Sequence, residues 1–102
     1  MLPEYSMVEL DESLFEGFKN NLLSSKKSHT VVKLSEKLTI TEEHISFFIN
    51  TSISYKKDGM SFVVIKKGID IDNFPEELNI VPTLQEAEDI LEMEAIERDL
   101  GF

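Results

Sequence analysis

The chain contains no cysteine and no tryptophan, and only four glycines and three prolines among its 102 residues. Without cysteine the protein forms no disulfide framework and no thiolate zinc site, and it has no cysteine nucleophile. The few glycines build no Gly-x-Gly-x-x-Gly or Walker-type loop, so nothing in the sequence indicates a nucleotide held by backbone amides. The Gly-x-Ser-x-Gly motif of serine hydrolases is missing as well. Several common enzyme classes are therefore not indicated.

Histidine is equally scarce, because His29 and His44 are the two imidazoles of the chain. They show no metal-binding spacing such as H-x-H-x-D or H-E-x-x-H, and a catalytic metal needs about three protein ligands. The segment Asp70–Asn73 resembles the start of a calcium loop, but Pro75 stands where that loop requires glycine, and its closing glutamate is missing. We therefore expect no catalytic residues, no metal and no cofactor, and predict that the protein is not an enzyme.

The sequence also lacks long apolar runs and an N-terminal targeting signal. No run approaches the ~20 apolar residues of a membrane span, and Glu4 stands where a secretory signal carries basic residues. Apolar residues make up 41% and charged residues 29%, a composition typical of one globular domain. These features predict a cytoplasmic protein of one domain, residues 1–102, with no membrane partner.

The net charge of −10 lies in one part of the chain. Residues 1–68 hold nine acids and nine bases, whereas residues 69–102 hold eleven acids and one base, Arg98. Such a surface repels phosphate backbones, so we expect neither nucleic acid nor an anionic membrane as a direct ligand. It suits a basic protein partner. A solvated helix that keeps the protein soluble is the alternative interpretation.

Hydrophobic spacing and turn residues predict an alternation of strands and helices. We expect strands over residues 5–10, 29–34, 61–65 and 78–81, and helices over 13–25, 41–57 and about 83–100. Because parallel neighbours need crossover connections, this order predicts an α/β fold with a small mixed, mostly parallel four-stranded sheet packed with helices.

Each predicted helix carries start signals and an apolar stripe. Ser13 and Glu16, and Thr83 and Glu86, fit capping boxes, and Thr41 or Thr39 is suited to cap the middle helix. We expect the stripes of the first two helices to be buried, at Leu14, Phe15, Phe18 and Leu22, and at Ile45, Phe48, Ile49 and Ile53.

The last helix carries two apolar faces. The early face would pack on the sheet and comprises Leu84, Ala87, Ile90, Leu91 and Ala95. The late face lies on a different side and comprises Met93, Ile96, Leu100 and Phe102. Two interpretations stay open: the late face packs on the first helix or the sheet edge, or it is a dimer or partner contact with an acidic rim.

Three segments resemble the STAS domains of anti-sigma factor antagonists. IVPTLQEA (Ile80–Ala87) and MEAIERDLGF (Met93–Phe102) are similar to the tail of a short STAS-like group from the Bacteroidetes, and VKLS (Val32–Ser35) stands where STAS domains have a Val-Asp-Leu-Ser strand end. The resemblance covers residues 29–102 and implies a STAS-like fold. Family members open with a two-strand hairpin, so the resemblance leads us to expect that the first hairpin strand is missing here.

The resemblance also implies a switch at the start of the second helix. STAS domains carry Asp-Ser-Ser-Gly-Leu there, and the second serine takes phosphate from an anti-sigma kinase; this chain has Thr41, Glu42, Glu43, His44 and Ile45. A glutamate carries about −1 against roughly −1.5 to −2 for phosphoserine, and its charge is permanent. We expect phosphorylation at this position to be lost, and the surface to be held in a state like the phosphorylated one. With a gap in the alignment, Thr41 or Ser46 remains an acceptor.

Together these features predict a non-catalytic, STAS-like regulatory module that acts by protein–protein interaction. Its partner would be an anti-sigma factor or another basic protein, with Thr41–Ile45 as the recognition edge and the late face of the last helix as a second patch. The alternatives are a self-associating scaffold, such as a homodimer, and an acidic mimic of nucleic acid. Short chains of this group sometimes carry the label ribonuclease Z, but two isolated histidines do not supply that enzyme's histidine-rich two-metal site.

Overall fold

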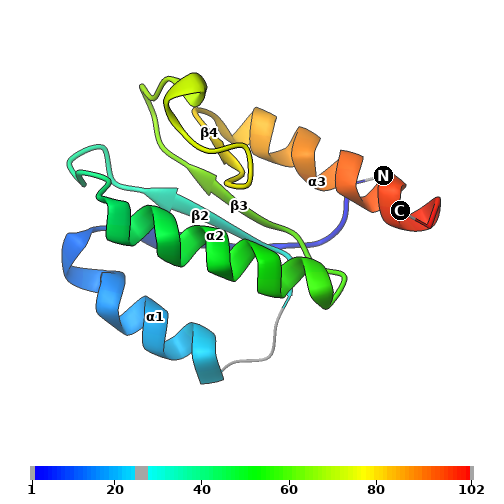
Figure 1. The fold of residues 1–102 in the computed structure, drawn as a ribbon, viewed down its shortest axis with the longest axis horizontal. Coiled ribbons are helices and arrows are strands. Elements are labelled where there is room, and N and C mark those ends of the chain that lie inside the picture. The colour runs from blue at the N-terminus through cyan, green and yellow to red at the C-terminus, as the bar shows by residue number, and fades with distance from the viewer. Residues whose placement is uncertain (1, 25–27, 102) are drawn as a thin grey trace.

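Four strands and three α-helices alternate along residues 2–24 and 28–101, which the computed structural model describes, with the side chains of residues 21–24 left outside that description (Figure 1). In chain order the elements are β1 (Ser6–Leu10), the 3₁₀ turn η1 (Glu12–Leu14), α1 (Phe15–Ser24), β2 (Thr30–Leu34), α2 (Glu42–Lys57), β3 (Phe62–Ile65), the 3₁₀ turn η2 (Ile71–Asn73), β4 (Ile80–Val81) and α3 (Leu84–Asp99).

The strands form one sheet in the order β1-β2-β3-β4, and every neighbouring pair is parallel. The predicted α/β fold with a four-stranded sheet is thus confirmed. The sheet was expected to be mixed, but in the described residues it is entirely parallel. Parallel pairing follows from the long connections, since each link between two neighbouring strands contains a helix or a crossing segment. No helix in the described ranges has the length and apolarity that a membrane crossing requires.

One face of the sheet lies against α1 and α2 (Figure 1). Its core is aromatic: Phe15 and Phe18 of α1, Phe48 of α2 and Phe62 of β3 are all buried. Phe15 packs edge-on against Phe48 with 6.0 Å between the ring centroids. Leu78, in the segment between β3 and β4, is buried in the same cluster. All three crossings therefore lie on this face, as consecutive right-handed crossovers require.

The opposite face is covered by α3, which contacts β3 and β4 (Figure 1). Ala87 and Leu91 of α3 are fully buried against valine side chains of the sheet. The N-terminal segment adds Tyr5, whose hydroxyl donates a 2.9 Å hydrogen bond to the Glu88 carboxylate of α3. This hydrogen bond, together with burial and the carboxylate charge, raises the pKa of Tyr5. Two elements distant in the sequence thus close this side of the sheet.

Parts of the expected apolar stripes are not buried. Leu14 is exposed because it belongs to the 3₁₀ turn η1, which precedes the α-helical repeat. The helical turn begins at Asp11, whose carboxylate accepts from the Leu14 backbone N–H, and not at the Ser13–Glu16 box. Ile53 and Leu84 are also exposed, whereas the side chain of Leu22 lies outside the described residues.

The buried stripe of α2 runs through His44, Phe48, Thr51 and Tyr55. This register leaves Ile53 exposed, with Ile45 and Ile49 half-buried at the flanks. The predicted stripe was therefore wrong in its register, although its central member Phe48 is buried as expected. The aromatic rings of Phe48 and Tyr55 are buried in the core, and Ile45 and Ile49 lie beside them.

Candidate functional site

The start of α2, the predicted recognition edge, is built around a cap. The Thr41 hydroxyl accepts a 3.3 Å hydrogen bond from the His44 N–H, and His44 Nδ1 accepts one of 3.1 Å from the Thr41 N–H. The His44 ring is buried edge-on against Phe15, with 4.4 Å between the centroids. The sequence placed this histidine on the surface edge, whereas in the structure it holds the cap and α1 together.

The same edge presents its acids to solvent. Glu42 and Glu43 are exposed, and Glu43 Oε1 lies 3.8 Å from the ammonium of Lys19 on α1. Thr41 is exposed, whereas Ile45 is half-buried in the core. The structure thus brings Thr41, Glu42 and Glu43 together as an accessible acidic turn, with His44 and Ile45 behind it. Negative charge there also suits the positive end of the α2 dipole.

The late apolar face of α3 points to solvent. Met93, Ile96 and Leu100 are 53%, 56% and 68% exposed, on the side of the helix opposite the buried Ala87 and Leu91. These three residues, called the outer stripe below, belong to neither core cluster and are not among the side chains packed against one, so the packed interpretation of this face is wrong for them. Phe102, its expected fourth member, lies outside the described residues.

Acids border the outer stripe on both sides. Glu92, Glu97 and Asp99 are exposed beside it. Arg98, the one base of this third of the chain, points inward instead and donates a 3.2 Å hydrogen bond from Nη1 to Ser61 Oγ. The surface around the stripe therefore carries negative charge that the guanidinium does not offset.

Ser61 connects Arg98 to His29 at the start of the sheet. The Ser61 backbone N–H donates a 3.0 Å hydrogen bond to His29 Nδ1, so the neutral ring carries its proton on Nε2. Burial lowers the pKa of His29, and the nearby Arg98 charge lowers it further, against the opposing influence of Glu94. This arrangement favours the neutral imidazole. His29 and Arg98 are both hydrogen-bonded to the same buried residue, Ser61.

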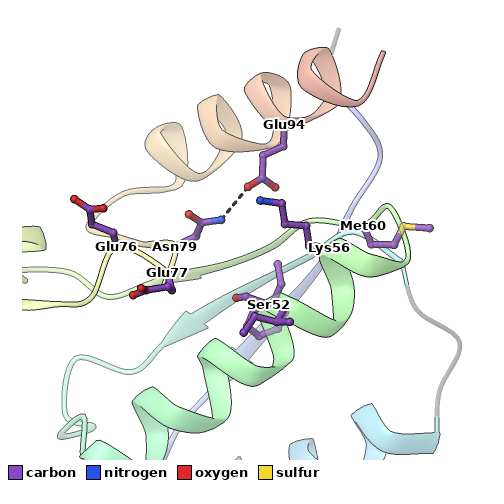
Figure 2. A pocket seen from close by; sticks show the side chains of 9 residues that line it. Ser52, Lys56, Met60, Glu76, Glu77, Asn79 and Glu94 are labelled. Atoms are coloured by element: carbon purple, nitrogen blue, oxygen red, sulfur yellow. Dashed lines mark hydrogen bonds between the residues drawn. The ribbon is translucent and has the colours of Figure 1, made fainter. Parts of the chain in front are cut away.

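A cavity of about 240 Å³ lies between α2 and α3, beside the part of β3 that does not pair with β4. Lys56 reaches into it from α2, Glu94 from α3 and Asn79 from the segment before β4 (Figure 2). The Asn79 amide Nδ2 donates a 3.0 Å hydrogen bond to Glu94 Oε2, which holds the carboxylate in place. Ile53 and Met60 supply apolar walls.

One buried polar atom lies beside this cavity. Ser52 Oγ, from a residue that lines it, is the one buried side-chain oxygen or nitrogen without a hydrogen-bond partner in the described residues. A buried hydroxyl without a partner costs about 1–3 kcal/mol. Sequence reasoning missed this site. The available signal was Glu94, an acid on the same helical face as the buried Ala87 and Leu91.

No cluster of three or more potential metal ligands occurs within residues 2–24 and 28–101. The chain matches no protein-family model, no curated protein and no solved structure. The resemblance to STAS domains therefore stays a prediction, and the function rests on the surfaces just described.

Proposed function

We propose that this protein is a non-catalytic, STAS-like regulatory module that acts by binding another protein through the outer stripe of α3. The observation that carries the proposal is the exposure of Met93, Ile96 and Leu100 on a helix whose other side is already packed. Three large apolar side chains in one line on a solvent-facing helix are typical of a contact surface for a partner helix.

Charge favours a basic partner over a second copy of the chain. Two identical outer stripes in contact would bring the carboxylates of Glu92, Glu97 and Asp99 close to those of the other copy, and like charges at an interface oppose association. A partner with an apolar stripe flanked by lysine or arginine meets both features. Such a partner fits the anti-sigma factor or other basic protein that the sequence predicts.

The acidic turn of Thr41, Glu42 and Glu43 is proposed as a second contact. In the STAS-like interpretation Glu43 occupies the phosphoacceptor position and supplies a permanent negative charge. Its carboxylate is exposed and lies near a single lysine, so a basic partner can reach it. Replacing Glu43 by lysine should weaken binding, whereas unchanged affinity would remove this turn from the interface.

The direct experiment compares proteins captured from the cells of origin by matched variants. The stripe variant carries Met93→Ser, Ile96→Ser and Leu100→Ser, and the control carries Leu14→Ser and Ile71→Ser, which remove exposed apolar side chains elsewhere. We expect the wild type and the control to retain the same partner and the stripe variant to lose it. Retention of that partner by the stripe variant would refute the proposal.

Sedimentation of the purified protein separates this function from self-association. We expect a monomer with or without the stripe substitutions. A wild-type dimer that dissociates in the stripe variant would instead support the scaffold alternative, because the same side chains would then contact a second copy.

A further inference from the structure

The cavity between α2 and α3 opens on an unpaired part of the sheet. β4 pairs only with Val64 and Ile65, so Phe62 has no strand neighbour on this edge within the described residues. The Val64 N–H donates to the Asn79 carbonyl across this edge. Because backbone groups two residues apart in a strand point the same way, the Phe62 N–H and C=O also face this side. A donor and an acceptor thus stand side by side in the wall.

Opposite charges stand on the two sides of the opening. Lys56 extends from α2 toward Glu94 on α3 (Figure 2). No ion pair joins them, and within the described residues Lys56 has no other ion-pair partner. The Glu94 carboxylate is fixed by Asn79. The site therefore offers a cation and an anion that no ion pair joins.

The size of the cavity and its apolar walls restrict the ligand further. A cavity of about 150 Å³ holds benzene, so one of about 240 Å³ has room for about nine or ten heavy atoms. That is too small for a nucleotide. Ile53 and Met60 suit an aliphatic group.

We propose that this cavity binds a free α-amino acid with an aliphatic side chain. Its carboxylate would accept from Lys56 and from the Phe62 N–H, and its ammonium would donate to Glu94 and to the Phe62 carbonyl. The side chain would lie against Ile53 and Met60. This inference is independent of the outer stripe, which lies on the other side of α3, so either proposal can fail without the other.

The first test is a titration of the ¹⁵N-labelled protein with L-leucine, followed by NMR. We expect saturable shifts of the Ser52, Lys56, Met60 and Asn79 amides, with a dissociation constant of ~1 mM or tighter. N-acetyl-leucine lacks the ammonium and leucine amide lacks the carboxylate, so each should bind at least ~10-fold more weakly. Absence of shifts at these amides, or equal binding of the three compounds, would overturn the proposal.

The second test uses paired variants of neighbouring residues. Lys56→Gln and Glu94→Gln should each weaken leucine binding ~10-fold or more, since each removes one charge-assisted contact. Lys57→Gln and Glu92→Gln are the controls, because both residues are exposed on the same two helices and do not line the cavity. Equal loss in a variant and its control would show a nonspecific charge effect and contradict the assignment.

Discussion

Helices α2 and α3 have the same length, 16 residues each, but they use their surfaces differently. α2 buries two aromatic rings, Phe48 and Tyr55, together with His44 and Thr51. α3 buries only Ala87 and Leu91, and it leaves the three residues of the outer stripe exposed. The fold thus depends on α2 through aromatic side chains, whereas α3 contacts the sheet through aliphatic ones, mainly Ala87 and Leu91, and leaves its outer stripe exposed.

The difference extends to charge. α2 begins with two acids and ends with two lysines, which matches its dipole, whereas α3 is acidic along its whole length. The fold itself explains little of why α3 combines acidic residues with an exposed apolar stripe. Contact with another protein accounts for both features at once.

Phe48→Ala should have the largest effect on stability. Phe48 is 1% exposed and contacts Phe15, Phe47 and Phe62. Truncation of such a ring costs about 3–5 kcal/mol, so we expect urea unfolding to move to much lower denaturant. Ile53→Ala on the same helix is the control and should change the free energy of unfolding by at most ~0.5 kcal/mol. Similar losses in both variants would show that α2 is packed differently.

Leu91→Ala tests the core side of α3 directly against its outer side. Leu91 is fully buried, and its loss should reduce the free energy of unfolding by about 2–4 kcal/mol. Leu100→Ala removes the same side chain from the exposed end of the outer stripe and should cost at most ~0.5 kcal/mol. If Leu100→Ala destabilises as much as Leu91→Ala, the outer stripe contributes to the fold and its proposed role is wrong.

The helix caps allow a finer comparison. Thr41→Ala should cost about 1–2 kcal/mol, because its hydroxyl belongs to a reciprocal pair that also holds the His44 ring against Phe15. Thr83→Ala removes one hydroxyl that accepts from the Glu86 N–H, and it should cost about 0.5–1 kcal/mol. Equal or reversed losses in thermal unfolding would contradict the difference between the two helix starts.

A weaker effect is expected from pH. Because the pKa of His29 is lowered in the folded protein, protons bind first to the unfolded chain, whose histidine titrates near 6.5. Stability is therefore complete above ~6.5, falls as the pH decreases below it, and levels off below the folded pKa. His29→Gln keeps an acceptor for the Ser61 N–H but does not titrate, so its stability should change less between pH ~7.5 and ~5. Identical pH profiles would contradict this role of His29.

Much of the fold could be predicted because local signals agree with the tertiary structure. Thr41 caps α2 as expected, and the apolar run of β3 is buried on both faces. The register of α2 could not be predicted, because isoleucine and phenylalanine have similar hydrophobicity and their spacing alone does not decide which of them is buried. The prediction that Leu14 is buried was wrong for another reason, since a 3₁₀ turn changes the spacing on which the prediction depended.

The candidate sites divide in the same way. The outer stripe was visible as a second apolar face on one helix. The cavity was not, because Lys56, Asn79 and Glu94 come together only through the short β4, whose length the sequence did not specify. His44 was misplaced because a histidine near a helix start can cap the helix with Nδ1 as well as face solvent.

The most direct test maps the partner on the surface of the ¹⁵N-labelled protein, by NMR titration with the protein that the wild type captures. The account predicts that the largest amide shifts lie at Met93, Ile96 and Leu100, and that smaller ones lie at Glu42 and Glu43. Shifts centred on the β1 edge or on the aromatic side of the sheet, with none in α3, would contradict it.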